Sequence, residues 1–164
     1  MNSKPPLAIR PERPDHPQVV ALLAELDAYL AGLYEPEANH ILSLQELLAP
    51  EVRFLAAWHG SVLVGCGAVR SMPGDAATQG ERYVEVKRMM VLPAARGQGV
   101  AAALLAALEE AVRGQGISLA MLETGTLQTN AVRLYERGGY ALRPAFGGYP
   151  DNGLSLFYAK RLQP

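Results

Sequence analysis

The spacing of apolar residues in the N-terminal part of the chain predicts two helices. Apolar side chains recur every three or four residues over 19–30, which is typical of a helix with one buried face, and Asp15 stands where an N-cap is expected. Ser43 and Glu46 have the S-x-x-E spacing of a capping box, in which side chains satisfy the free N–H groups at a helix start. A second, shorter helix is therefore expected from Ser43.

Alternating and continuous apolar runs predict several strands. The first run covers 7–10, and two further runs, 52–58 and 61–69, are joined by a short glycine turn and read as a hairpin. A longer strand is expected over 82–92. Strict alternation would give this strand one face with Glu85, Lys87, Met89 and Val91, and another with Val84, Val86, Arg88 and Met90.

The second half of the chain predicts helices and strands in alternation. A continuous apolar run at 117–122 is typical of a buried strand, and helices are expected over 97–113 and 130–137, each followed by glycine. Two last strands, 140–143 and 154–160, flank a glycine-rich loop. This order of elements predicts an α/β (α+β) protein.

Composition narrows the class of protein without indicating an activity. The 164 residues are 49% apolar and 19% charged with a net charge of −1, which predicts one folded domain over 1–164 and argues against nucleic-acid binding. The sequence has neither an apolar run of membrane-spanning length nor a signal region, so the cytoplasm is the expected compartment and no membrane partner is expected. Cys66 is the single cysteine and is expected to act as a small buried hydrophobe.

The turn between the long strand and the following helix carries the first chemical signal. It consists of Arg96, Gly97, Gln98, Gly99, Val100 and Ala101. A helix that begins there presents unpaired backbone N–H groups and the positive end of its dipole, and the glycines let a ligand approach the backbone. The turn lacks the Lys-Ser/Thr pair of a P-loop and the third glycine of a dinucleotide-binding fingerprint. We expect it to bind a phosphate or pyrophosphate.

Local patterns, together with the order of elements, resemble the GNAT acetyltransferase superfamily. The segment V-L-P-A-A-R-G-Q-G-V-A at 91–101 resembles the Q/R-x-x-G-x-G/A pyrophosphate loop, which in this family follows a V-x-P strand end. The segment A-V-R-L-Y-E-R-G-G-Y at 131–140 resembles the family's A-x-x-L-Y-x-x-x-G-F/Y segment. Glu85 stands six positions before the strand-end valine, where the family carries an acidic residue. Residues 146–160 resemble the closing hairpin of bacterial small-molecule members.

The resemblance implies a fold, a co-substrate and an enzyme class. The fold is a central mixed, mostly antiparallel sheet of about seven strands flanked by four helices. The co-substrate is acetyl-CoA, and no metal is expected. The activity is that of an acyltransferase, which moves the acetyl group onto a primary amine of a small molecule by direct attack in a ternary complex. The resemblance is compatible with both a monomer and a homodimer.

The resemblance also assigns the cofactor site. The pantetheine arm is expected to pair with the backbone of Met90 and Val91, as an added strand does. The pyrophosphate is expected on the turn at 96–101. The family carries Asn seven positions before its tyrosine, whereas this chain has Gln128 there and Asn130 two residues later. Either amide is expected to bind the arm, and the sequence leaves the choice open.

Acetyl transfer to an amine needs a proton acceptor and a proton donor. The amine has a pKa of roughly 10.4 and is mostly protonated at neutral pH, while the departing thiolate, with a pKa of roughly 8.5, is stabilised by a hydrogen bond. Tyr135 matches the family tyrosine and is the expected acid, in contact with the cofactor. Glu85 is the expected base, acting through water, and pairing with Lys87 or Arg88 is its alternative role. Glu123 is an alternative base or an acceptor ligand.

The acceptor site is the part that the sequence specifies least. The resemblance places the acceptor between the first two helices and the closing hairpin, near Tyr29, Tyr34, Glu35, Tyr149 and the loop at 150–153, with Glu123 as a further acceptor ligand. Lys87 and Arg88 would suit an acceptor carboxylate, as in an amino acid, and His40 is a further candidate for the wall. Two other functions remain open: a non-catalytic CoA-binding sensor or interaction module, and an N-acetyltransferase of proteins or peptides.

Overall fold

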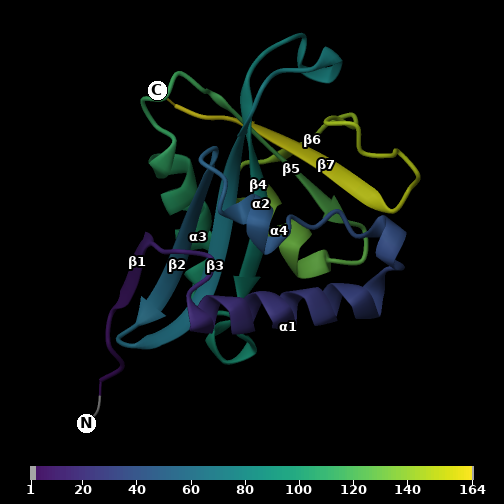
Figure 1. Cartoon of the computed structure of the whole chain (residues 1–164). Helices are drawn as coiled ribbons and strands as arrows, with labels where there is room; N and C mark the ends of the chain where they lie inside the picture. Colours follow the sequence, from purple (N-terminus) through teal and green to yellow (C-terminus); the bar gives the residue numbers. More distant parts are fainter. Residues whose placement is uncertain (1–2, 164) are drawn as a thin grey trace.

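The computed structural model describes residues 3–163, which form a mixed sheet of seven strands (Figure 1). The strand order is β1-β2-β3-β4-β5-β7-β6, and the neighbouring strands are antiparallel except for β4 and β5. The expected mixed, mostly antiparallel sheet is therefore confirmed. The strands are β1 Leu7–Pro11, β2 Val52–His59, β3 Val62–Met72, β4 Tyr83–Val91, β5 Leu119–Gly125, β6 Ala141–Leu142 and β7 Ser155–Arg161.

Within residues 3–163, four α-helices cover the two faces of this sheet, as expected. They are α1 Pro17–Leu33, α2 Leu44–Leu47, α3 Val100–Ala111 and α4 Thr129–Arg137. Three single-turn 3-10 helices lie in the connections, namely η1 Pro36–Ala38, η2 Ala76–Thr78 and η3 Pro93–Ala95. The apolar sides of α1 and α2 pack on one face, and those of α3 and α4 pack on the other. Removal of these apolar side chains from water on both faces stabilises the layers.

The start of α1 differs from the expected one, whereas the start of α2 is confirmed. His16 rather than Asp15 is the N-cap of α1, because its ring nitrogen accepts a hydrogen bond from the backbone N–H of Gln18 at 3.2 Å. Asp15 instead pairs with the preceding Arg13 at 2.7 Å. The capping box that begins at Ser43 is present as expected.

The expectation that side chains alternate strictly between the two faces of β4 is wrong, because the strand contains a β-bulge at Arg88. Arg88 has a φ of 59°, in the left-handed region, and the register with β3 shifts by one residue at this point. The extra residue moves Met89 and Val91 to the face that packs on α3, and Met90 to the face that packs on α1. Only the part of β4 before the bulge keeps the expected two faces.

The pairing of β4 with β5 is short and leaves an opening in the sheet. It joins Val84 and Glu85 of β4 to Ala120 and Met121 of β5. Within residues 3–163, β4 and β5 make no further pairing with each other beyond this point, so their C-terminal halves separate, while β4 stays paired with β3 and β5 with β7. β5 begins at residue 119 rather than 117 and runs to residue 125, so Glu123 lies within the strand and beside the opening.

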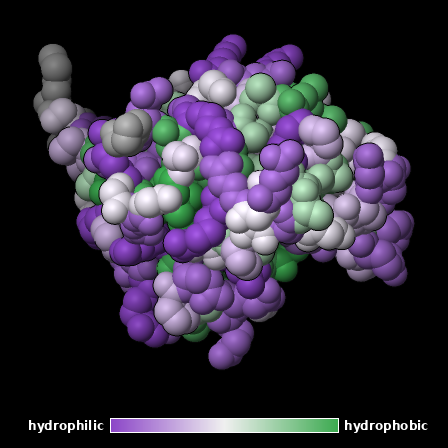
Figure 2. Space-filling view, turned by 90° about the horizontal axis from the view of Figure 1, so that it is seen from above, coloured by the Kyte–Doolittle hydropathy of each residue, from purple (hydrophilic) through white to green (hydrophobic). Residues whose placement is uncertain are grey.

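Hydrophilic side chains cover most of the face seen in Figure 2, and apolar ones show between them. This surface agrees with a composition in which charged residues are 19% of the chain. None of the helices within residues 3–163 is long and apolar enough to cross a membrane.

Candidate active site

The opening between β4 and β5 connects two hollows. A groove of about 650 Å³ lies between α3, α4 and the end of β4. A cavity of about 90 Å³ is lined by the last turns of α1, the segment that follows it, and the parted halves of β4 and β5. Both hollows are lined by Leu26, Met89, Gln128 and Tyr135. A molecule that fills the groove and enters the opening therefore meets the cavity at Tyr135.

The groove is lined by all but one of the residues expected to bind the cofactor. Its wall includes Met90, Val91, Arg96, Gly97, Gly99, Val100, Ala101, Gln128, Asn130 and Tyr135. Both candidate amides face the groove, so the choice between them stays open. The exception is Gln98, whose side chain accepts a hydrogen bond from Lys4 Nζ at 2.6 Å and donates one to the Ala94 carbonyl at 3.2 Å.

The N-terminus of α3 opens into this groove without a side-chain cap. The helix begins at Val100 rather than at residue 97, because Gly99 precedes it with a φ of 80°, and it ends at residue 111 rather than 113. A Cβ on Gly99 would meet no atom within 4 Å, so the space beside this backbone is free. Arg96 holds the turn against the strand end, since its Nε donates to the Val91 carbonyl at 3.2 Å. The free N–H groups and the helix dipole suit an anion here.

Cationic side chains line the same groove beyond the turn. Arg133 and Arg137 lie one turn apart on α4 and are exposed, and Arg96 adds a third positive charge. A fourth cation, Lys160, pairs with Glu109 at 2.8 Å. In a chain with a net charge of −1, this concentration of positive charge suits a polyanion. Our sequence analysis missed the two α4 arginines, although their i, i+4 spacing shows that they share a helix face.

Tyr135 lies at the junction of the two hollows with its ring in the core. The residue is 7% exposed and its ring packs edge-on against Tyr140, with centroids 6.0 Å apart. Burial, with a smaller contribution from the charge of Glu123, raises the pKa of the Tyr135 phenol above its usual value. Its hydroxyl makes no hydrogen bond to any residue of the described chain. The phenol therefore keeps its proton and has it free for a ligand.

Glu85 does not line either hollow. The residue is 3% exposed, and the Tyr149 hydroxyl donates a hydrogen bond to its Oε2 at 2.5 Å. Lys87 Nζ lies 3.7 Å from the same oxygen and donates to the Tyr149 hydroxyl at 2.7 Å. Of the two roles considered for Glu85, the structure shows the pairing with Lys87. Tyr149 likewise lines neither hollow, although an acceptor contact was expected for it.

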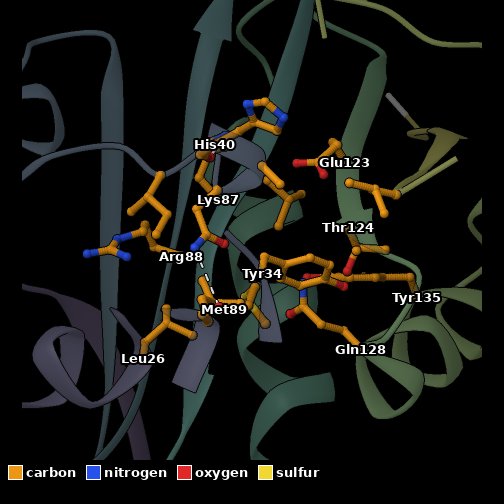
Figure 3. A pocket seen from close by; sticks show the side chains of 17 residues that line it. Leu26, Tyr34, His40, Lys87, Arg88, Met89, Glu123, Thr124, Gln128 and Tyr135 are labelled. Carbon is orange, nitrogen blue, oxygen red and sulfur yellow. Dashed lines mark hydrogen bonds between the residues drawn. The ribbon is translucent and has the colours of Figure 1, made fainter. Parts of the chain in front are cut away.

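Lys87 and Arg88 are both occupied by other partners. Besides Tyr149 and Glu85, Lys87 Nζ donates to the His40 carbonyl at 3.1 Å. The Arg88 guanidinium forms a two-nitrogen pair with Asp27 of α1, and Figure 3 shows its side chain directed away from the cavity. This geometry contradicts the expectation that the two cations hold an acceptor carboxylate.

Glu123 is the carboxylate that lines the cavity. It projects from β5 on the same side as Tyr135, with His40 nearby (Figure 3). Its Oε1 accepts a hydrogen bond from the Ser155 hydroxyl at 2.8 Å. Burial raises the pKa of the Glu123 carboxyl above its usual range, although Ser155 and the charge of Lys87 act in the opposite direction. A carboxylate with a raised pKa in the same cavity as a tyrosine hydroxyl is suited to proton transfer.

Two further acceptor candidates occupy different places. Tyr34 lines the cavity as expected, and its hydroxyl accepts a hydrogen bond from the Leu127 N–H at 3.0 Å. It lies so close to Gly125 that a Cβ there would come within 1.8 Å of the hydroxyl oxygen. Tyr29 is 48% exposed and lines the groove, not the cavity.

Comparisons with known proteins support the resemblance seen in the motifs. The profile of the acetyltransferase (GNAT) family matches residues 19–140. A protein of Azospirillum brasilense named IAA acetyltransferase is 44% identical over 158 residues, which are 96% of this chain and 99% of the relative. A Klebsiella pneumoniae protein classed as an acyl-CoA N-acyltransferase has a solved structure that matches with a TM-score of 0.75 at 34% identity, over 96% of this chain and 98% of that one.

A more distant structure shares the fold. The PaiA N-acetyltransferase of Thermoplasma acidophilum, solved in complex with coenzyme A, matches with a TM-score of 0.71 at 18% identity, over 95% of this chain and 99% of that one. The profile and the Azospirillum relative both extend across the turn, the opening and Tyr135. The chain therefore belongs to the acetyltransferase (GNAT) family and is an acetyl-CoA-dependent N-acetyltransferase.

Proposed function

We propose that this enzyme transfers the acetyl group of acetyl-CoA to a primary amine of a small molecule, by direct attack in a ternary complex. The observation that carries the proposal is the junction of a long, cationic groove with a small cavity at Tyr135. Such a junction lets a thioester reach the acceptor while the rest of the cofactor stays in the groove. Holding both reactants in contact accounts for a large part of the rate of a direct transfer.

The groove suits each part of CoA. The pyrophosphate would lie on the free N–H groups at the start of α3, with Arg96, Arg133 and Arg137 as counter-charges. The pantetheine arm would run along the backbone of Met90 and Val91, where β4 has left its pairing with β5. The coenzyme A complex of the structurally similar PaiA enzyme supports the use of this fold for that ligand.

We assign the base to Glu123 and the hydrogen-bond donor for the leaving sulfur to Tyr135. Glu123 lines the cavity and has a raised pKa, whereas Glu85 is held by Tyr149 and Lys87 behind the wall. Glu123 takes a proton from the incoming ammonium group. The amine nitrogen then bonds to the thioester carbonyl carbon and the carbon–sulfur bond breaks, and the second nitrogen proton passes to the departing sulfur, so that the products are the amide and the free thiol of CoA. The Tyr135 O–H stabilises the departing thiolate.

The position of Cys66 supports transfer without an acetyl-enzyme. The thiol is fully buried and lines neither hollow, and it contacts the Arg88 carbonyl at 3.5 Å. Burial raises the pKa of the Cys66 thiol to about 12, although the charge of Arg88 acts in the opposite direction. A thiol in this state is a poor nucleophile.

The size of the cavity favours a small acceptor over a peptide. Its volume is about 90 Å³, and Tyr34 crosses from the end of α1 to the loop after β5, where the Leu127 N–H binds its hydroxyl. A peptide acceptor would need a groove that continues past this bridge. A CoA-binding sensor remains the second candidate, since a cofactor groove alone would serve it.

A turnover screen tests the proposal. Thiol release from acetyl-CoA is followed with simple amines, amino acids, polyamines, aminoglycosides and peptides, at varied concentrations of both substrates. We expect turnover with at least one small amine and intersecting double-reciprocal lines, as a ternary complex requires. Turnover with peptides alone would overturn the small-molecule assignment, and parallel lines would overturn direct transfer. CoA binding without turnover of any acceptor would favour the sensor.

A further inference from the structure

We infer that the acceptor is a primary amine without a carboxylate, bound as its ammonium ion by Glu123. The inference rests on the proposed function and deepens it, because it specifies the chemical class of the acceptor. It is drawn from three features of the cavity: the two nearby cations are paired within the protein, the Glu123 carboxylate has a free oxygen, and the remaining wall offers no further lysine or arginine.

Lys87 is held by partners within the protein. An ammonium group has three N–H bonds, and three oxygen atoms surround Lys87 Nζ. They are the Tyr149 hydroxyl at 2.7 Å, the His40 carbonyl at 3.1 Å and Glu85 Oε2 at 3.7 Å. Two of its N–H groups are donated within the protein and Glu85 lies close enough to balance its charge, so Lys87 is a poor partner for an acceptor carboxylate.

Arg88 is neutralised on the far side of β4. Its side chain is 6% exposed, and both terminal nitrogens bind the Asp27 carboxylate. The β-bulge places Arg88 at a φ of 59°, and Figure 3 shows the guanidinium directed toward α1 rather than into the cavity. An acceptor carboxylate would have to break this pair to use Arg88.

Glu123 is left as the net charge of the cavity wall. Oε1 accepts from Ser155, and within the described chain Oε2 accepts no hydrogen bond. Besides the paired Lys87 and Arg88 and the tyrosines Tyr34 and Tyr135, His40 is the remaining titratable group on this wall, and its ring packs edge-on against Tyr149 with centroids 5.1 Å apart. An ammonium ion would complete the hydrogen bonds of Glu123, whereas a carboxylate beside it would be repelled and left unpaired.

The remaining wall mixes apolar and neutral polar side chains. The apolar part consists of Leu26, Leu30, Ile41, Val86, Met89 and Leu154, and the neutral polar part includes Asn39, Thr124 and Gln128. An alkyl chain can be buried against the first group, and none of these side chains carries a positive charge that would pair with a carboxylate. The cavity therefore combines one anionic contact with a wall that offers no unpaired lysine or arginine, which is the pattern that an amine without a carboxylate fits.

Matched acceptors that differ in the carboxylate alone test the inference. We would compare isoamylamine with leucine and phenethylamine with phenylalanine, and add leucinamide, in which a neutral amide replaces the carboxylate. We expect kcat/KM to be at least ~100-fold higher for each amine than for its amino acid, which corresponds to ~2.7 kcal/mol, with leucinamide between them. Equal or better use of the amino acids would overturn the inference and leave acetyl transfer to small amines intact. Failure of every small amine, with peptides used instead, would be a failure of the proposed function.

The source of the discrimination is tested by Glu123→Gln with Glu37→Gln as its control. Glu37 is an exposed carboxylate of η1 that does not line the cavity. The readout is the amine-to-amino-acid ratio of kcat/KM, because a loss of rate affects both substrates. We expect the ratio to fall at least ~10-fold, or ~1.4 kcal/mol, in Glu123→Gln and to stay unchanged in Glu37→Gln. If Glu123→Gln is too slow to assay, the same ratio is measured as binding of each acceptor to the CoA complex. An unchanged ratio in Glu123→Gln would overturn the role of Glu123.

Discussion

The Tyr149 hydroxyl lies 2.5 Å from Glu85 Oε2 and 2.7 Å from Lys87 Nζ, so one phenol bridges both members of a buried ion pair. Burial and the charge of Glu85 raise the pKa of the Tyr149 phenol above its usual value, which keeps its proton on the oxygen. The bridge joins the closing loop to β4 and holds the Lys87 ammonium, at the wall of the cavity, beside the Glu85 carboxylate. It explains why Glu123 is the charge of the acceptor site that is left without an ion pair.

Tyr149→Phe should destabilise the fold without preventing cofactor binding. The variant leaves the Glu85 carboxylate and the Lys87 ammonium each without one partner, and such a loss at a buried charged group costs about 1–3 kcal/mol. The free energy of unfolding in urea measures this cost. Tyr29→Phe is the matched control, because Tyr29 is 48% exposed. Equal stability of Tyr149→Phe and wild type would mean that the bridge contributes nothing.

The assignment of the base predicts different behaviour for the two glutamates. Glu123→Gln should lower kcat by about 10²-fold at neutral pH, because the protonated amine loses its acceptor. The defect should shrink at high pH, where free amine accumulates in solution. Glu85→Gln should keep most of its turnover and lose stability instead, since it removes the counter-charge of Lys87. pH–rate profiles and unfolding curves of both variants separate the roles, and the reverse pattern would return the base to Glu85.

The raised pKa of Glu123 also predicts a gain in stability on its removal. Because burial disfavours the charged form in the folded state, the ionised carboxyl costs stability at any pH above its raised pKa. The cost disappears below the usual pKa of a glutamate, where the group is protonated in both states. Glu123→Gln should therefore melt at a higher temperature than wild type at neutral pH, and the difference should narrow on acidification. A variant less stable than wild type at neutral pH would argue against this reasoning.

The parts of the site that depend on local sequence were predictable. The turn at 96–101 and Tyr135 follow from residues close together in the chain, and the structure brings them to one groove. Local sequence also predicted the capping box at Ser43, and it predicted the ends of most helices and strands to within a few residues. Glycine positions, apolar spacing and caps act over one or two turns, so the chain itself displays them.

The distinction between Glu85 and Glu123 depends on contacts between distant segments. Tyr149, which lies 64 residues from Glu85 in the chain, removes that carboxylate from the site. The bulge at Arg88 is equally nonlocal, because it arises from the register of β4 against β3. It reverses the faces of Met89 and Met90 that alternation predicts. Tertiary packing determines both the pairing of Glu85 and the bulge at Arg88. A periodic pattern within one strand cannot predict either of them.

Tyr135→Phe should lower turnover and leave CoA affinity unchanged. The substitution removes only the O–H at the junction of the two hollows, and loss of such a donor typically costs about 10²-fold in rate. Tyr140→Phe is the matched control, because its hydroxyl binds Glu109 at 3.0 Å, away from the junction. The control should lose about 1 kcal/mol of stability and keep its turnover. If Tyr135→Phe turns over as wild type does when chemistry limits the rate, the tyrosine serves packing alone.

Gly99→Val should weaken CoA binding by about tenfold or more, which corresponds to about 1.4 kcal/mol. The new side chain would occupy the free space beside the N-terminus of α3, where the pyrophosphate is proposed to lie. The left-handed backbone also adds strain of about 1–2 kcal/mol, so a loss of stability by itself would prove nothing. Gly114→Val provides the control, because Gly114 has the same φ of 80°, equally open surroundings and a place beyond the other end of α3.

Both glycine variants should therefore lose similar stability, and only Gly99→Val should lose affinity. Thermal unfolding measures the first quantity, and calorimetric titration with CoA measures the second. Unchanged affinity of Gly99→Val would show that the turn is structural and that the phosphates bind elsewhere in the groove. An equal loss of affinity in Gly114→Val would trace the effect to strain in α3 rather than to a blocked anion site.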